Sequence, residues 1–422
     1  MRMRKLLSGL ILLLMFACFA GCAEDEKAVN ITSDTSLVTI SETSDENHQD
    51  DATSMESETE SEPEPEPAPE PEPEPEPDPV ELILQKMSLE QKVYQMFVCS
   101  PEQLMGYREK TSTDEALLDT LKKWPVGGII YFYSNFENPT QTVEMISTAQ
   151  EYSYEASGLP LFTCVDEEGG RVSRIGRQEA FGLKWVGPMA SIKTDEEAYE
   201  TGLYIGEYLK DLGLNFNFAP IADVLTNKSN EAIGDRSFSS DPIVVSTRAA
   251  LLAGGLQENG VIATYKHFPG HGGTEGDTHD GLAYTNKTLD ELMADEMIPF
   301  MEAEENGIEA IMVAHISVPN VLGDYLPCSL SYDMITGLLR KEFGYSGLII
   351  TDAFNMAAIT EYGDEACVMA VDAGVDLILI PNNVEAGANA IINAINDGRL
   401  SEERIDESLR RIIKAKINIM NN

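Results

Sequence analysis

Short apolar segments alternate with amphipathic segments along most of this chain, and that alternation restricts its fold more than any other feature. The apolar runs cover residues 95–99, 128–133, 161–166, 216–223, 261–267, 310–315, 348–352 and 377–382. The stretches between them look helical, for example 198–212 and 401–417, where Ser401 is expected to cap the helix N-terminus. Eight strand-helix alternations predict an α/β protein with parallel strands, closed as a single (β/α)8 TIM barrel, with a doubly wound open sheet as the alternative.

Polar or ionisable side chains recur where these apolar runs end. They are Asp166, Asp223, Lys266, His315, Asp352 and Asn382. In a barrel the carboxyl ends of all strands meet at one mouth, whereas in an open sheet they lie along an edge. The pattern therefore favours the barrel and predicts that its mouth carries the chemistry.

The glycine-rich window 266–279, which begins at the end of the fifth apolar run, holds three of the five histidines of the chain. Asp277 stands two residues before His279 and could orient its imidazole as a general acid. A metal site built on His267, His271 and Asp277 is the competing interpretation. No HExxH motif occurs, and Lys266 would place a positive charge beside the ion, so we predict no metal and expect His271 to be structural.

Two further strand ends could contribute to catalysis or binding. Asp352, delivered by an apolar strand, could act as a nucleophile or could merely cap the next helix. Asp166 together with Arg174 and Arg236 could hold sugar hydroxyls by charge-assisted hydrogen bonds, or could form a structural ion-pair network. His315 is expected to make a polar contact at the barrel mouth.

The N-terminus resembles an export signal. Residues 1–21 combine a basic head, a short apolar core and small residues before Cys22, as in a bacterial lipoprotein signal peptide. Cys22 would then be lipidated, and the protein would be anchored to the outer face of the bacterial cytoplasmic membrane. An uncleaved anchor helix is the alternative, although the apolar part is short for a membrane span.

Residues 22–79 are expected to form a disordered linker. They carry twenty Asp or Glu and one Lys, nearly half of the formal charge of −43, and end in a Glu-Pro repeat. The globular part, residues 80–422, is still acidic, which argues against a nucleic-acid partner. Its cysteines have no close partner in sequence and are expected to be buried free thiols: Cys99, Cys164, Cys328 and Cys367.

The run Lys-His-Phe-Pro-Gly-His-Gly that begins at Lys266, followed by Asp277-Thr278-His279, resembles glycoside hydrolase family 3, in particular its β-N-acetylglucosaminidase branch. The similarity extends from about residue 84 to 417. It implies a barrel enzyme without a cofactor that removes terminal, non-reducing β-linked N-acetylglucosamine with retention, through a covalent glycosyl-enzyme. Many β-glucosidase members take a glutamate acid/base from a second domain after the barrel. This chain stops at Asn422, soon after its last barrel-type helix, and we expect it to use the His-Asp pair instead.

The resemblance also assigns roles to individual positions. Asp352 matches the nucleophile, and His279, assisted by Asp277, matches the general acid and base. The positions that match residues holding the sugar hydroxyls are Asp166, Arg174, Arg236, Lys266 and His267. Two positions depart from the family pattern, Ala353 and Gly273, where an aspartate is often found; both could shift substrate preference.

Other functions remain compatible with these residues. Within the family they are a β-glucosidase or β-xylosidase, or a phosphorylase that uses phosphate instead of water. Outside enzymes, the chain could be an inactive surface lipoprotein that binds glycans. The expected partners are a glycan substrate and, through Cys22, a membrane; the sequence indicates no particular protein partner, and cell-wall-derived sugars are a reasonable substrate for a surface enzyme.

Overall fold

The structure is a computed structural model that describes residues 78–106, 110–279 and 281–421. The predicted signal peptide, Cys22 and nearly all of the predicted linker lie outside the described residues. Helix α1 (Pro79–Leu84) begins one residue before the predicted start of the globular part. Its cap is local in sequence, because the Asp78 side chain accepts a hydrogen bond from the backbone N–H of Val80 at 2.9 Å.

Eight parallel strands form a barrel in the described part of the chain. They are β1 (Phe97–Cys99), β2 (Gly128–Tyr131), β3 (Phe162–Val165), β4 (Phe216–Asn217), β5 (Ile262–Phe268), β6 (Ala310–Val313), β7 (Leu348–Thr351) and β8 (Ile378–Leu379). Neighbours in the sheet follow the order β7-β6-β5-β4-β3-β2-β1-β8. A parallel bridge between Ile350 and Leu377 joins β7 to β8 and closes the ring. The predicted barrel is therefore confirmed, and the open sheet is excluded.

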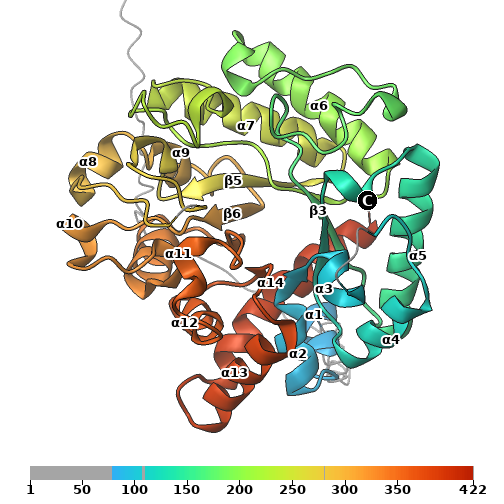
Figure 1. The fold of residues 1–422 in the computed structure, drawn as a ribbon. Coiled ribbons are helices and arrows are strands. Elements are labelled where there is room, and N and C mark those ends of the chain that lie inside the picture. Colours follow the sequence, from blue (N-terminus) through green and yellow to red (C-terminus); the bar gives the residue numbers. More distant parts are fainter. Residues whose placement is uncertain (1–77, 107–109, 280, 422) are drawn as a thin grey trace, which may run out of the picture. The chain divides into compact units, whose positions relative to one another are not determined.

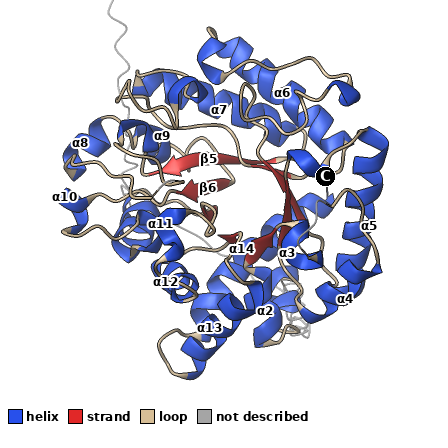
Figure 2. Ribbon diagram, in the orientation of Figure 1, coloured by secondary structure: helices blue, strands red, loops and turns tan. Residues whose placement is uncertain are grey.

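Helices surround the strands, as Figures 1 and 2 show. After α1 the helices are α2 (Leu89–Gln95), α3 (Pro101–Met105), α4 (Glu115–Lys123), α5 (Pro139–Ser157), α6 (Asp195–Asp211), α7 (Pro242–Glu258), α8 (Leu289–Ala294), α9 (Ile298–Met301), α10 (Pro319–Leu322), η7 (Asp333–Glu342), α11 (Ala357–Thr360), α12 (Glu365–Ala373), α13 (Val384–Asn396) and α14 (Glu402–Asn421). Ser401 caps α14 as expected, because its Oγ accepts a hydrogen bond from the Arg404 N–H at 3.2 Å.

Two strands, β4 and β8, are much shorter than their apolar runs. The fourth run extends to residue 223, but β4 ends at Asn217, and the eighth extends to residue 382, but β8 ends at Leu379. Each run contains a proline, Pro220 and Pro381, which has no N–H to donate to a neighbouring strand. The chain continues along the barrel wall as irregular backbone, which brings the polar residues after β4 to the mouth.

The C-terminal helix α14 is hydrogen-bonded to residues at the amino ends of three strands. The buried Lys416 Nζ donates hydrogen bonds to Gln95 Oε1 at 2.8 Å, to the Gly127 carbonyl at 2.9 Å and to the Pro160 carbonyl at 2.6 Å. Gln95 ends helix α2 just before β1, and Gly127 and Pro160 lie just before β2 and β3. Burial lowers the pKa of Lys416 to about 7. One side chain thus ties the last helix to three strands.

The four cysteines of the described region are buried and unpaired, as predicted. Within the described residues, no helix has the length and apolar character that a membrane crossing requires.

Candidate active site

All eight predicted site residues line two adjoining cavities at the carboxyl ends of the strands. The first cavity has a volume of about 320 Å³ and is lined by Asp166, Arg174, Arg236, Lys266, His267, His279 and Asp352, among others. The second, of about 430 Å³, shares Arg236, His267, His279 and Asp352 with it and adds Asp277. The barrel thus gathers residues that are up to 186 positions apart in the printed sequence.

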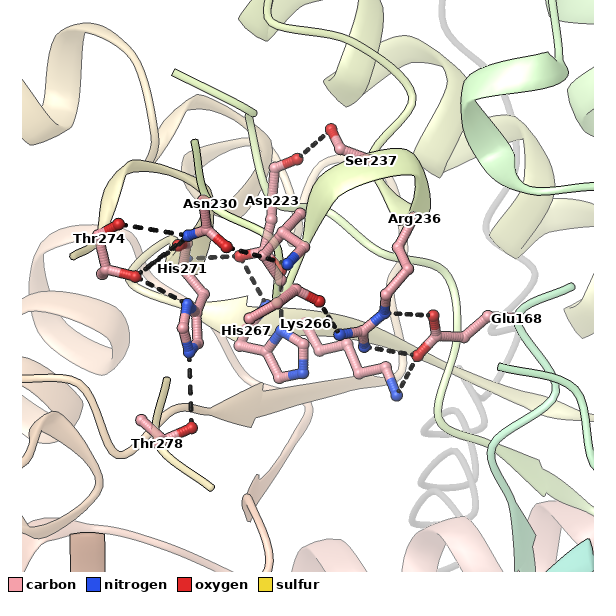
Figure 3. Close-up of polar contacts among 12 residues, drawn as sticks. Glu168, Asp223, Asn230, Arg236, Ser237, Lys266, His267, His271, Thr274 and Thr278 are labelled. Carbon is pink, nitrogen blue, oxygen red and sulfur yellow. Dashed lines mark hydrogen bonds and ion pairs between the residues drawn. The ribbon is translucent and has the colours of Figure 1, made fainter. Parts of the chain in front are cut away.

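Lys266, at the end of β5, lies between two carboxylates. Its Nζ is 2.8 Å from Asp166 Oδ1 and 2.8 Å from Glu168 Oε1. Arg236 binds the same Glu168 with two hydrogen bonds, from Nε at 2.9 Å and from Nη2 at 2.8 Å (Figure 3). Arg174 Nη2 is 3.4 Å from Asp166 Oδ2. The predicted contact between Asp166 and Arg174 is present, whereas Arg236 contacts Glu168 instead.

Glu168 and Lys266 are held in their charged forms. Burial alone would raise the pKa of Glu168, but the charges of Arg236 and Lys266 outweigh it and hold that pKa far below its usual range. Burial would lower the pKa of Lys266, but Asp166 and Glu168 raise it above its ordinary value. Fixed charges at this wall can orient a polyol through strong hydrogen bonds.

Asp223 and His267 form a second buried pair. Asp223 Oδ2 is 2.7 Å from His267 Nδ1, and its Oδ1 accepts the backbone N–H groups of His267 at 3.1 Å and His271 at 2.6 Å. Burial would raise the pKa of Asp223, but the interaction with His267 outweighs it and lowers that pKa. The ionised carboxylate therefore keeps the proton on Nδ1 of His267 and leaves Nε2 to face a ligand.

His271 holds the loop that follows β5, as Figure 3 shows. Its Nδ1 is 2.9 Å from Thr274 Oγ1, and its Nε2 is 3.5 Å from Thr278 Oγ1. Burial and the neighbouring His267 lower its pKa. The expected structural role of His271 agrees with these contacts.

Asp352 follows β7 and stands at the junction of the two cavities. Its Oδ1 accepts the N–H of Ala353 at 2.8 Å, and helix α11 begins only at Ala357 with no side chain capping it. The helix-capping alternative for Asp352 is therefore wrong. Burial would raise the pKa of Asp352, but His267, His315 and the N–H of Ala353 outweigh it, so the pKa is lowered and the carboxylate is ionised.

His315 is buried next to the backbone that follows Asp352 and lines neither cavity. It is fully buried, and its Nε2 is 3.1 Å from the Ala353 carbonyl while its Nδ1 is 2.7 Å from Ser329 Oγ. Burial lowers its pKa. The expected mouth contact is thus corrected to a buried one that fixes the backbone beside Asp352.

Asp277 and His279 pair on the loop above the cavities. Asp277 Oδ1 is 2.9 Å from His279 Nδ1 and also accepts the His279 backbone N–H at 2.9 Å. Partial burial would raise the pKa of Asp277, but the two hydrogen bonds from His279 outweigh it and lower that pKa. The His279 side chain is 73% exposed, so Nε2 can reach a ligand that enters from solvent.

Sequence reasoning missed Glu168, which stands two residues after Asp166. Asp223 was expected at the mouth as a strand-end group, but its pairing with His267 was not predicted. Asn382 was expected with the strand-end groups but lines neither cavity; Asn355, after β7, lines the first one instead.

Comparison with known proteins agrees with this arrangement. The family described as "Glycosyl hydrolase family 3 N terminal domain" matches residues 88–415. The chain is 34% identical over 334 residues to Beta-hexosaminidase A of Pseudoalteromonas piscicida, covering 72% of this chain and 56% of that protein. It is 35% identical over 273 residues to Beta-hexosaminidase of Xylella fastidiosa (strain M23), covering 62% and 78%.

A solved structure is also similar. The glycoside hydrolase family 3 β-N-acetylglucosaminidase from Paenibacillus sp. str. FPU-7 superposes with a TM-score of 0.73 at 37% identity, covering 79% of this chain and 63% of that one. The chain thus spans less than two thirds of two of these relatives. Because the family match extends over most of the sequence and the barrel, the chain belongs to glycosyl hydrolase family 3.

Proposed function

We propose that this protein is a retaining, exo-acting β-N-acetylglucosaminidase that releases terminal non-reducing N-acetylglucosamine from cell-wall-derived or related glycans. The observation that carries the proposal is that Asp352 and His279 line the same two cavities. A nucleophile and a proton donor that share one sugar-sized pocket are what a double-displacement reaction needs. The names of the similar proteins support the choice of sugar.

The reaction would run in two steps. In the first, an oxygen of Asp352 attacks C1 of the sugar, the glycosidic C–O bond breaks, and His279 gives a proton to the leaving oxygen. In the second, neutral His279 takes a proton from water, the water oxygen attacks C1, and the ester bond to Asp352 breaks. The His-Asp pair takes the place of the second carboxylate that most retaining glycosidases use.

The charged wall of the first cavity would hold the hydroxyl groups of the sugar. Asp166 can accept hydrogen bonds from hydroxyls, and Lys266 and Arg236 can donate them. Arg174 has a buried Nε without a hydrogen-bond partner among the described residues, which a substrate oxygen could satisfy. These groups would hold the sugar throughout the reaction, whereas Asp352 would form and break a bond to C1 and His279 would transfer a proton.

The experiment that tests the proposal measures release from aryl β-glycosides of N-acetylglucosamine, glucose and xylose, with and without inorganic phosphate. Preferred hydrolysis of the N-acetylglucosaminide, with a β-configured first product, is expected. Preference for the glucoside or xyloside would support the β-glucosidase or β-xylosidase alternative, and a sugar 1-phosphate would support the phosphorylase. No release from any of the three would support the inactive glycan-binding alternative.

Asp223→Asn is expected to lower kcat/KM for the aryl N-acetylglucosaminide by roughly 10- to 100-fold. An amide can donate to Nδ1 of His267, so the ring would take the other tautomer or lose the 2.7 Å contact. Steady-state kinetics measures the effect, with Asp241→Asn as the control, because Asp241 is an exposed aspartate that caps α7. Unchanged kcat/KM in a folded Asp223→Asn variant would contradict this role.

We further propose that the mature protein is anchored through a lipid on Cys22 at the outer face of the cytoplasmic membrane. The support is the signal-like composition of residues 1–21. Cys22→Ser should abolish labelling by a fatty acid and release the activity from the membrane fraction. Equal labelling of both forms in the bacterial host would count against the anchor.

A further inference from the structure

A third cavity, of about 460 Å³, lies on the segment between β3 and α6 and shares no lining residue with the two cavities of the active site. Lys184 and Trp185 line it from this segment, and Glu200 and Tyr204 line it from α6. The same segment, residues 166–194, also carries Asp166, Glu168 and Arg174. A ligand here would therefore be held by the loop that builds one wall of the active site.

Trp185 is 58% exposed beside this cavity, and its backbone is fixed on both sides. The N–H of Lys184 donates to Tyr204 Oη at 2.7 Å, and the Val186 carbonyl accepts the N–H of Gly170 at 2.9 Å. The exposed indole is thus presented by an ordered backbone rather than by a free chain.

Glycines allow residues 184–188 to pack closely against the backbone that follows Glu168. A Cβ on Gly169 would come within 2.7 Å of the Gly187 carbonyl oxygen, and one on Gly170 within 2.8 Å of the Pro188 Cα. Trp185 Cη2 would lie 3.8 Å from a Cβ at Gly187, so the ring packs over a residue without a side chain. The position of the indole is therefore coupled to the backbone next to Glu168.

We propose that this cavity is an accessory binding site for a sugar unit of the glycan chain, with the pyranose stacked on Trp185; this inference rests on the proposed function. The C–H face of a pyranose is apolar and matches an indole face, while its hydroxyls need polar partners at the rim. Lys184 and Glu200 can supply these, because both line the cavity with exposed side chains.

The charge of the cavity argues against an anionic ligand. Its ionisable lining consists of one lysine, Lys184, and two glutamates, Glu197 and Glu200, together with Tyr204. With two carboxylates against one ammonium group the lining carries a net negative charge, which gives a phosphate or a nucleotide no net attraction. An N-acetylglucosamine unit carries no charge and offers donors and acceptors to both kinds of group.

The two tryptophans of the chain, Trp124 and Trp185, give a direct test. Trp124→Phe leaves Trp185 as the only indole, and Trp185→Phe leaves Trp124, which lies beneath the Lys123 ammonium at 4.4 Å, as the matched control. Both variants also carry Asp352→Asn to preserve the ligand. N-acetylchitopentaose should shift the emission of Trp185 to shorter wavelength and leave that of Trp124 unchanged.

Calorimetry on further Asp352→Asn variants measures the contribution of the ring. Trp185→Ala should weaken binding at this site about tenfold, and Trp185→Tyr should restore most of it, because tyrosine keeps an aromatic face. A second titration with soluble peptidoglycan strands distinguishes the two sources of the chain. A shift with either ligand supports the site, and the ligand that produces it identifies the source.

The outcome that overturns the site is no emission change of Trp185 with either ligand, or an equal change in the protein that retains only Trp124. Hydrolysis of the aryl N-acetylglucosaminide by the wild-type protein is measured separately. Loss of the Trp185 response with hydrolysis intact refutes only the accessory site, whereas a response without any hydrolysis refutes the proposed function.

Discussion

Asp352→Ala is expected to lower turnover of an aryl β-N-acetylglucosaminide by about 10⁴-fold or more, because the variant lacks the carboxylate that would form the bond to C1. The lowered pKa of Asp352 keeps this group ionised at neutral pH, so the wild-type nucleophile is ready to react. Initial rates at saturating substrate measure the effect. Circular dichroism and thermal unfolding establish that the variant is folded.

Two controls separate loss of a nucleophile from a general disturbance. Asp119→Ala removes an exposed aspartate from the outer helix α4 and should retain wild-type turnover. Azide added to Asp352→Ala should restore part of the rate, because a small anion can occupy the vacated space and attack C1, giving the α-glycosyl azide. Wild-type turnover in Asp352→Ala would remove the nucleophile assignment and the mechanism with it.

His279→Ala is expected to lower kcat/KM by about 10²- to 10⁴-fold for N,N′-diacetylchitobiose. The leaving oxygen of that substrate needs a proton, which His279 Nε2 would supply. The loss of kcat/KM should be far smaller for a dinitrophenyl N-acetylglucosaminide, because its leaving group departs without protonation. Comparing the two substrates distinguishes a general acid from a residue that only positions the sugar, since a positioning residue would affect both equally.

The pairing of His279 with Asp277 predicts a pH effect. The pKa of Asp277 lies below its ordinary value of 3.8, so the carboxylate is ionised above that pH and its support of the imidazolium is lost as the pH falls through the folded-state pKa. Asp277→Asn removes this support at every pH. The basic limb of the kcat/KM profile should therefore move to lower pH in the variant, and the shift should be modest because both side chains are partly exposed.

Leu282→Ala is the matched control for both variants. Leu282 is 53% exposed on the same loop and lines neither cavity, so its replacement tests whether any change in the loop reproduces the effect. A wild-type profile in Asp277→Asn, or equal losses for the two leaving groups in His279→Ala, would show that this pair does not transfer the proton.

The sequence predicted the fold more completely than the site. Each apolar run became a strand, because a barrel strand is buried on both faces and so must be apolar throughout. Errors arose where a proline interrupts the run, at Pro220 and Pro381. The apolar character of a run does not show that a proline within it leaves the neighbouring strand without an N–H donor, so the strand ends earlier than the run.

For the site, the predicted residues were found together because strand ends converge in any barrel. Their partners could not be predicted. Arg236 could have paired with Asp166 or Glu168, and the packing of the segments after β3 and β4 at the mouth decides for Glu168. Likewise, nothing in the sequence near Asp223 indicates that it would contact the N–H groups of His267 and His271.

The order of the chain alone thus determined that eight strands would form and which polar groups would follow them, since periodicity, proline and glycine act over a few residues. Tertiary structure decided which of those groups share a proton or a charge. Lys266 stays protonated and Asp352 stays ionised only because each is buried beside particular opposite charges, and those neighbours come from strands far away in sequence.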